Sequence, residues 1–306
     1  MNIDKIKQIL FNYRIVFIVA LLFPLLNYNI SVVNDWKKKE VKFRLFKRVA
    51  DSLIKYGVDS YSVFSLVNDK RTHYNERFAR INISPQVNLD FSEVYSQQTI
   101  KIIQKFIENN FEILIKAETT FGVPKEIISI ILWVETKFGK VLGKNHIPSV
   151  LFSMATSTET SILAQSVDTI NNRNWKTDTL YEVTLQRAKK KEEFAIKELL
   201  ALFEIQKKGF FEIRDLYGSY SGAFGLPQFL PSSYLQYGFD GNKDGKIDLF
   251  NLEDAIFSIG NFLKKNGFIP NDTNSYYTSL FKYNRSRQYV QAILWAYNEL
   301  IRKKAK

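Results

Sequence analysis

Glu135 lies on the apolar face of a predicted helix. Residues 123–139 are VPKEIISIILWVETKFG, and Pro124 is well placed to open the helix. At helical spacing, Glu135 shares a face with Ile128 and Ile131. A carboxyl group on an apolar face is desolvated, which favours its protonated form and raises its pKa. Glu135 is therefore a candidate general acid; the alternative is a structural glutamate that reaches a buried lysine or arginine, or one at a helix end at the surface.

A second segment is rich in glycine, serine and proline. Residues 218–234 are GSYSGAFGLPQFLPSSY, and their small side chains permit close approach of the backbone to a ligand. Gln228 offers an amide donor and acceptor that suit an N-acetyl group. No G-K-[ST] follows, so the segment is not a phosphate-binding loop. Ordinary turns also need glycine, and a turn is the alternative interpretation.

The third segment, residues 283–289, is YNRSRQY and opens the last predicted helix. Ser286 could cap this helix, and Asn284 could do so one register earlier. The functional interpretation is a polar and aromatic wall for sugar hydroxyls and ring faces.

Residues 240–248, DGNKDGKID, have the ligand spacing of an EF-hand calcium loop. Side-chain oxygens stand at positions 1, 3, 5 and 9, in Asp240, Asn242, Asp244 and Asp248. Gly245 occupies position 6, and Lys246 supplies a backbone carbonyl. Position 12 is Asn251 rather than the bidentate glutamate of the standard loop. The loop predicts structural calcium; the alternative is an Asx-rich turn in which Asn251 caps the next helix.

The first three segments together, in chain order, resemble the membrane-bound lytic murein transglycosylase B family of bacterial cell-wall enzymes, within the lysozyme-like superfamily. The resemblance covers about residues 91–303, apart from one insertion, and is strongest over 218–267. It implies that Glu135 is the sole catalytic acid/base. The implied substrate-binding residues are Ser219, Gln228, Phe229, Tyr283, Asn284 and Tyr289. The calcium loop of this family is longer and closes with a carboxylate three residues later, at Asp254.

The resemblance implies a lytic transglycosylase. Such an enzyme cleaves the β-1,4 bond between N-acetylmuramic acid and N-acetylglucosamine in peptidoglycan glycan strands and forms 1,6-anhydromuramic acid. One alternative is a hydrolytic, lysozyme-type muramidase, which normally needs a second carboxylate across the bond. No second carboxylate stands in the matched motifs, which are residues 131–139, 218–234 and 283–289. The other alternative is an inactive, calcium-stabilised peptidoglycan-binding module, against which the intact Glu135 argues.

Composition excludes several other chemistries. The 306 residues include no cysteine and two histidines. This excludes disulfides, cysteine-bound metals, thiol nucleophiles and a lipid on an N-terminal cysteine, and it disfavours a zinc hydrolase or a histidine triad. We expect no organic cofactor. The net charge of +12 favours an anionic partner such as an acidic cell-wall polymer or a membrane. No nucleic-acid motif accompanies the basic clusters, so we expect no nucleic-acid partner, and we expect a monomer.

The elements that must position these residues are mostly helices. Helical spacing predicts helices over about 36–53, 96–117, 185–208, 252–265 and 287–303. Any sheet is small and most expected within 147–220. The fold class is therefore mainly α (α+β, lysozyme-like). The expected organisation is a helical N-terminal lobe over 34–120 and a lysozyme-like catalytic core over 121–306, with a loop-rich or β insertion over about 153–185 and the EF-hand-like loop over 240–254.

The N-terminus has the pattern of an export signal. Lys5, Lys7 and Arg14 precede an apolar run over residues 15–26, which is short for a spanning helix. The following residues lack an A-x-A cleavage pattern, so residues 1–33 are predicted to be a signal peptide or an uncleaved signal anchor. The predicted location is the periplasm or cell envelope, with residues 15–33 as a membrane tether in the anchor alternative.

Overall fold

A computed structural model describes residues 39–80, 90–164 and 177–304 of the chain. The chain divides into two compact units, Met1–Arg48 and Val49–Lys306. The predicted export segment, residues 1–33, lies outside the described residues. Residues 39–55 are helical, which agrees with the predicted first helix. All candidate site residues belong to the second unit, and the proposed boundary at residue 120 stays a prediction.

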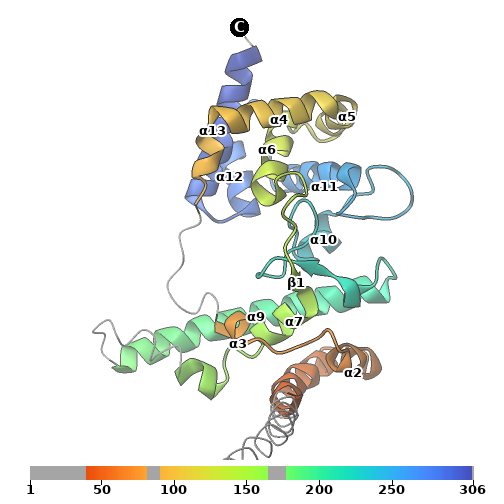
Figure 1. Cartoon of the computed structure of the whole chain (residues 1–306), viewed down its shortest axis with the longest axis vertical. Coiled ribbons are helices and arrows are strands. Elements are labelled where there is room, and N and C mark those ends of the chain that lie inside the picture. Colours follow the sequence, from red (N-terminus) through yellow and green to blue (C-terminus); the bar gives the residue numbers. More distant parts are fainter. Residues whose placement is uncertain (1–38, 81–89, 165–176, 305–306) are drawn as a thin grey trace, which may run out of the picture. The chain divides into compact units, whose positions relative to one another are not determined.

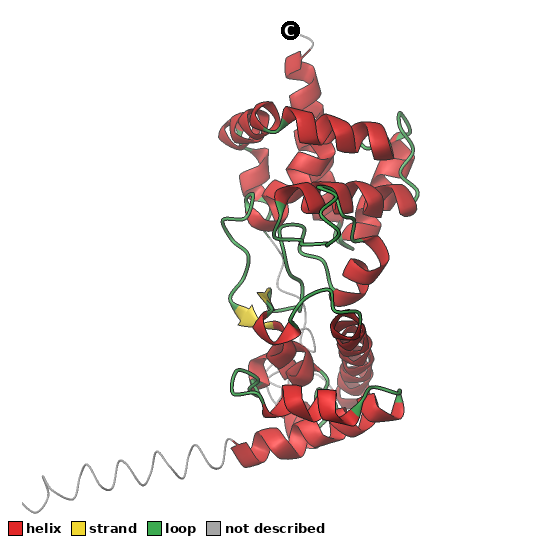
Figure 2. Cartoon of the chain, turned by 90° about the vertical axis from the view of Figure 1, so that its right-hand side faces the viewer, coloured by secondary structure: helices red, strands yellow, loops and turns green. Residues whose placement is uncertain are grey.

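The described elements are mainly helical, as Figures 1 and 2 show, and this confirms the mainly α fold class. The elements in the first half of the second unit are α2 (Ser60–Asn68), α3 (Glu76–Arg80), η1 (Ser92–Tyr95), α4 (Gln97–Asn109), α5 (Phe111–Phe121), α6 (Lys125–Thr136), β1 (Asn145–His146) and α7 (Ile147–Met154). Those that follow are α9 (Thr177–Lys207), η2 (Ile213–Asp215), β2 (Tyr217–Gly218), α10 (Pro231–Tyr237), α11 (Leu252–Lys265), α12 (Thr273–Tyr283) and α13 (Arg287–Lys304).

Helix α6 is the central element of the second unit's upper helical group in Figure 1. It packs against α4, α5, α11 and α13, so most of its residues are buried, including Ile128 and Ile131. The preceding helix ends at Gly122, whose φ of 71° is the left-handed conformation that glycine adopts without strain. Pro124 then precedes the first turn of α6. The local sequence thus fixes the start of the helix that carries Glu135.

Two predicted elements differ from the structure. The single helix expected over 96–117 is two helices, because the chain breaks at Asn110, whose side chain donates to the Phe106 carbonyl. The expected loop-rich insertion over 153–185 lies partly outside the described residues, and its last part is helical because α9 already begins at Thr177. There Leu185 packs against a small apolar cluster that includes Ile162 and Leu163. Tertiary packing stabilises a helix that weak periodicity did not indicate.

The sheet formed by β1 and β2 is small, as expected. The two strands are antiparallel, with Asn145 opposite Gly218. A Cβ atom added to Gly143 would lie 2.1 Å from the Gly218 carbonyl oxygen, so the backbones approach as closely as glycine allows. The sheet therefore ties the chain that follows α6 to the start of the glycine-rich segment.

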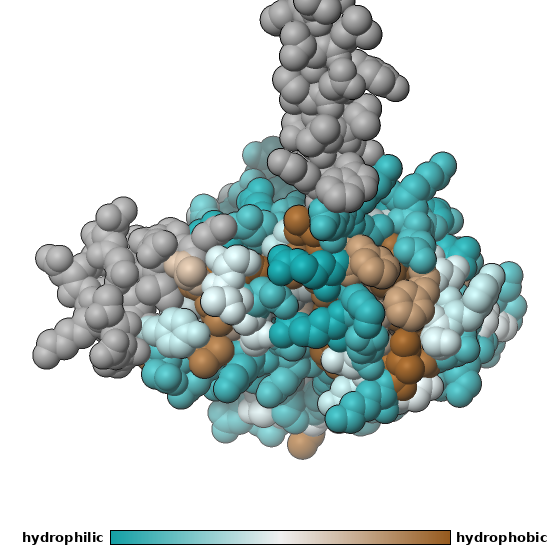
Figure 3. Space-filling view, turned by 90° about the horizontal axis from the view of Figure 1, so that it is seen from below, coloured by the Kyte–Doolittle hydropathy of each residue, from teal (hydrophilic) through white to brown (hydrophobic). Residues whose placement is uncertain are grey.

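The face of the molecule in Figure 3 is mostly hydrophilic, with hydrophobic residues in small separate groups. Single exposed apolar side chains are ordinary on soluble domains. Among the described residues, no helix combines the length and the apolar character that crossing a bilayer requires.

Candidate active site

The carboxyl group of Glu135 lies in a tyrosine-rich environment. Glu135 is the last residue but one of α6, and the Tyr289 hydroxyl, from the first turn of α13, donates to its Oε1 at 2.8 Å. Burial raises the pKa of Glu135 to about 7, while the hydrogen bond from Tyr289 acts in the opposite direction. Glu135 is therefore present in both protonation states near neutral pH, as a group that first donates and then accepts a proton must be.

The Tyr289 hydroxyl stays protonated and therefore remains a hydrogen-bond donor. Tyr289 is 1% exposed, and burial together with the nearby Glu135 raises the pKa of its hydroxyl well above the ordinary value. The hydroxyl therefore keeps its proton whenever Glu135 is ionised. Such a donor stabilises the carboxylate form without exchanging protons with it.

Aromatic rings form the wall beside Glu135. The rings of Tyr283 and Tyr289 are parallel, with centroids 6.3 Å apart, and Phe229 lies 5.9 Å from Tyr283. The structure thus brings together three of the predicted substrate-binding residues. Phe91 packs edge-on against Tyr289 at 5.7 Å. Sequence reasoning did not single out Phe91 as a site residue, because an isolated phenylalanine before a short turn carries no motif.

The glycine-rich segment is fixed to the helices around it. The Thr136 hydroxyl donates to the Leu226 carbonyl at 3.0 Å, and the Tyr283 hydroxyl donates to the Pro227 carbonyl at 2.6 Å. Gln228 follows with a φ of 50°, and its Nε2 donates to the carbonyls of Gly225 and Leu142 at 2.9 and 3.3 Å. Both amide hydrogens of Gln228 are thus used within the protein, and substrate contact by its Oε1 stays a prediction.

Ser219 and Asn284 have structural roles in turns. Ser219 Oγ accepts hydrogen bonds from the backbone N–H groups of Ser221 and Ala223, at 3.2 and 3.1 Å. Asn284 ends α12, and its carbonyl accepts from Ser286. Ser286 Oγ in turn accepts from the Tyr289 N–H at 3.3 Å, so Ser286 rather than Asn284 serves as the cap of α13. Substrate contact by Ser219 and Asn284 stays a prediction.

Hydrogen bonds link the side chains of the predicted calcium loop to the loop backbone and, between Asn242 and Asp244, to each other. Asp240 accepts from the backbone N–H groups of Asp244 and Gly245, at 3.2 and 2.9 Å, and Asn242 Nδ2 donates to Asp244 Oδ2 at 3.1 Å. Carboxylate and amide oxygens have further lone pairs beyond those used in these bonds. The donor set fits a hard cation such as calcium, which takes oxygen ligands.

The end of this loop is tied to α11. Asp254 is 1% exposed and accepts from the N–H groups of Gly241 and Asp248, at 2.9 and 2.7 Å. Asn251 accepts from the N–H groups of the first turn and caps α11, as its alternative interpretation predicted. Within the described ranges, no three or more histidine, aspartate or glutamate side chains are grouped as a metal site. Asp240 and Asp254 thus accept hydrogen bonds from backbone N–H groups of the loop.

Comparisons with known proteins agree with this geometry. Residues 45–280 match the family described as transglycosylase SLT domain. Over 157 residues the chain is 32% identical to the membrane-bound lytic murein transglycosylase B of Escherichia coli strain K12. That match covers 51% of this chain and 35% of the relative, so the chain spans about a third of the length of that curated protein.

Solved structures share the fold. The soluble lytic transglycosylase SltB1 of Pseudomonas aeruginosa is 20% identical with a TM-score of 0.67, covering 86% of this chain and 100% of that one. SltB3 of the same organism, in complex with NAG-anhNAM-pentapeptide, is 16% identical with a TM-score of 0.65, covering 85% and 79%. Escherichia coli Slt35 in complex with calcium is 19% identical with a TM-score of 0.64, covering 86% and 94%. The fold is thus the lysozyme-like fold of these proteins.

The family match covers well over half of the chain and contains Glu135, the glycine-rich segment and the predicted calcium loop. The chain therefore belongs to the transglycosylase SLT domain family.

Proposed function

We propose that this chain is a lytic transglycosylase that cleaves peptidoglycan between N-acetylmuramic acid and N-acetylglucosamine. The observation that carries the proposal is Glu135, a half-buried carboxyl group whose pKa is raised to about 7 by desolvation and which is hydrogen-bonded to Tyr289 beside an aromatic wall. The family match and the name of the Escherichia coli relative support the same activity. The complex of SltB3 with an anhydro-sugar peptide supports the same product class.

The proposed mechanism uses Glu135 twice. Protonated Glu135 donates its proton to the glycosidic oxygen, the bond between this oxygen and C1 of the muramyl ring breaks, and N-acetylglucosamine leaves as an alcohol. The positive charge that develops at C1 is relieved by the substrate's own N-acetyl oxygen. Glu135, now ionised and hydrogen-bonded by Tyr289, takes a proton from the C6 hydroxyl of the same ring. The C6 oxygen then closes the 1,6-anhydro ring. Gln228 Oε1 accepts from the N-acetyl N–H in this mechanism, because its own hydrogens are engaged.

Two rival functions, a hydrolytic muramidase and a binding module, can be distinguished from a transglycosylase. A hydrolytic muramidase needs a second carboxylate near the bond. Among the described residues, the polar side chain bonded to Glu135 is a tyrosine, and no carboxylate is a cause of its raised pKa. A binding module would retain peptidoglycan without cutting it. A zymogram with purified cell wall tests cutting: a cleared band supports an enzyme, and an uncleared band overturns the proposed activity in favour of a binding module.

Tyr289→Phe should move the alkaline limb of the pH–rate profile to higher pH. The Tyr289 hydroxyl lowers the pKa of Glu135, so its removal raises that pKa and keeps the acid protonated to higher pH. The maximal rate should fall, by about tenfold, because the ionised state that follows proton donation loses its donor. Cleavage rates measured between pH 5 and 9 check this. An unshifted alkaline limb would show that Tyr289 does not tune Glu135.

We also propose that Asp240, Asn242, Asp244, the Lys246 carbonyl and Asp254 bind calcium, with Asp248 near the ion or bonded to it through water. A ligand that binds only the folded state stabilises it, by about 2.7 kcal/mol at a hundredfold excess over Kd. Calcium should therefore raise the melting temperature of an EDTA-treated sample by several degrees. Asp244→Ala should remove this rise, and Lys243→Ala, a change in the same loop, should keep it. Equal melting curves with and without calcium would reduce the loop to an Asx-rich turn.

Export to the cell envelope is proposed from residues 1–33 and from the location of the proposed substrate. The related Escherichia coli protein is named as membrane-bound. Cell fractionation followed by sequencing of the N-terminus checks export and shows whether the signal is removed. Recovery of the chain in the cytoplasmic fraction with Met1 intact would contradict it.

A further inference from the structure

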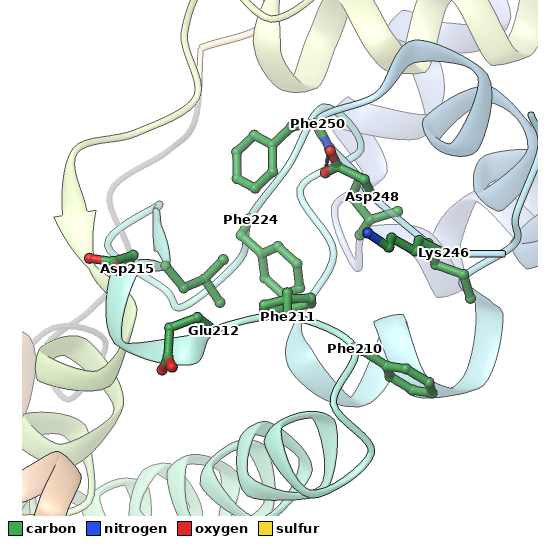
Figure 4. Close-up of a pocket in the computed structure, with 11 residues that line it drawn as sticks. Phe210, Phe211, Glu212, Asp215, Phe224, Lys246, Asp248 and Phe250 are labelled. Atoms are coloured by element: carbon green, nitrogen blue, oxygen red, sulfur yellow. Dashed lines mark hydrogen bonds between the residues drawn. The ribbon is translucent and has the colours of Figure 1, made fainter. Parts of the chain in front are cut away.

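A cavity of about 380 Å³ lies apart from the contacts of Glu135, between the chain after α9 and the second half of the calcium loop (Figure 4). Its lining comes from residues 210–212, 215 and 216, from Phe224 and from residues 246–250. Its volume falls within the range of small-ligand sites, about 300–1,000 Å³. Nothing in the proposed mechanism uses this cavity.

The interior of the cavity is apolar. Phe211 packs edge-on against Phe224 at 5.6 Å, and Leu249 closes the floor at 1% exposed. The rim keeps two rings in solvent, Phe210 at 41% and Phe250 at 45% exposed. A ligand with small apolar groups would cover these rings and remove apolar surface from water.

Three of the four charged side chains around the cavity are already engaged. Asp215 is paired with Arg71, and Glu212 accepts from the Arg214 N–H at 3.1 Å. Asp248 Oδ1 accepts from the Phe250 N–H at 2.8 Å. Figure 4 shows the carboxylates of Asp215 and Glu212 turned away from the rings.

Lys246 is different. It is exposed, and within the described part of the chain its ammonium forms no ion pair. In Figure 4 the ammonium extends toward the rings. The site therefore presents one available cation beside an apolar surface, which suits a ligand that joins a carboxylate to small apolar side chains.

We infer that this cavity binds the stem peptide of peptidoglycan, with a peptide carboxylate on Lys246 and the peptide's methyl groups against Phe211 and Phe250. The inference rests on the proposed function, because the peptide is carried by the muramyl sugar of that substrate. A short peptide of this kind combines free carboxylates with alanine methyl groups. The net charge of +12 favours such an acidic ligand as a whole.

The cavity is also joined to the active-site segment. Phe224 belongs to the glycine-rich segment, and the Leu226 N–H donates to the Leu249 carbonyl at 2.8 Å. One piece of backbone thus lies between the cavity wall and Gln228. Peptide-bearing strands would gain contacts here that bare glycan strands cannot make.

Calorimetric titration of the full chain with stem peptide released from peptidoglycan by an amidase tests the inference. The peptide should bind the wild type, and Lys246→Met, which keeps the apolar stem but removes the charge, should weaken binding by about five- to tenfold. Lys243→Met is the matched control, since Lys243 belongs to the same loop but does not line the cavity. It should bind like the wild type. Blocking the peptide carboxylates as amides should weaken wild-type binding by the same factor.

A second assay separates this inference from the proposed function. The KM of Lys246→Met should rise relative to the wild type more on peptide-bearing strands than on peptide-free glycan strands. Failure of every form to cleave either strand would overturn the proposed function. Cleavage with no difference between Lys246→Met and Lys243→Met, or equal weakening on bare glycan, would overturn the peptide site alone.

Discussion

Replacing Glu135 with glutamine should reduce peptidoglycan cleavage by about 10²–10⁴-fold, the usual contribution of a general acid–base group. Glutamine keeps the shape of the side chain and can still accept from Tyr289, but it has no proton to donate to the glycosidic oxygen. The fold should persist, because α6 is held by its buried apolar residues. The rate of release of soluble fragments from purified cell wall measures the loss.

The same substitution should increase stability at alkaline pH. A carboxyl group whose pKa is raised by folding supports the folded state below its unfolded pKa, and this support is lost as pH rises through the folded value. For Glu135 that window runs from about 4.5 to about 7. Ionisation above this window costs roughly 3 kcal/mol at most, and glutamine avoids the cost. Denaturant unfolding should show the variant more stable than the wild type at pH 8 and nearly equal at pH 4.

A control separates this effect from a general loss of charge. Glu112, exposed on α5, can be changed to glutamine in the same way. The free energy of unfolding of Glu112→Gln should follow the wild type at both pH values, and its activity should be unchanged. A pH-independent stability for Glu135→Gln relative to the wild type would contradict the desolvated state assigned to this carboxyl group.

Gly218→Ala should destabilise the protein and impair the active site together. An added Cβ would lie 2.0 Å from the Ala223 carbonyl oxygen and 3.0 Å from the Ile147 side chain. A backbone oxygen cannot move aside without opening the turn that holds Ser219 and leads to Gln228. Overpacking of this kind costs about 1–3 kcal/mol and occasionally more. Thermal unfolding and the cleavage rate of the variant check both effects.

Gly209→Ala provides the comparison. Gly209 has a φ of 67° and nothing within 4 Å of an added Cβ, so alanine there meets backbone strain but no collision. Its cost should stay near 1–2 kcal/mol, without a loss of activity at temperatures where the protein is folded. If Gly218→Ala were as active and as stable as the wild type, the close approach of Gly218 to the Ala223 carbonyl would not be needed to hold the site in place.

Local patterns in the sequence predicted the helix that carries Glu135 and the turn-rich loop at residues 240–254, whereas pairings between distant residues required the structure. Helical spacing placed Glu135 on an apolar face, and ligand spacing identified the loop at Asp240. The bond between Tyr289 and Glu135 joins residues 154 positions apart, which no periodicity can specify. The hydrogen bond from the Gln228 amide to the Leu142 carbonyl could not be predicted either, because these two residues are also far apart in the sequence. Helix ends such as Asn110 depended on a single side-chain cap and were also missed.

The chemistry at Glu135 is tested most directly by the mass of the muramyl ends released from purified peptidoglycan. The proposed mechanism has the C6 hydroxyl attack within the sugar, so the products should carry 1,6-anhydromuramic ends and contain no added water. Glu135→Gln should release almost none of them. Mass spectrometry that showed reducing muramyl ends, heavier by one water molecule, would contradict the transglycosylase mechanism and establish hydrolysis in its place.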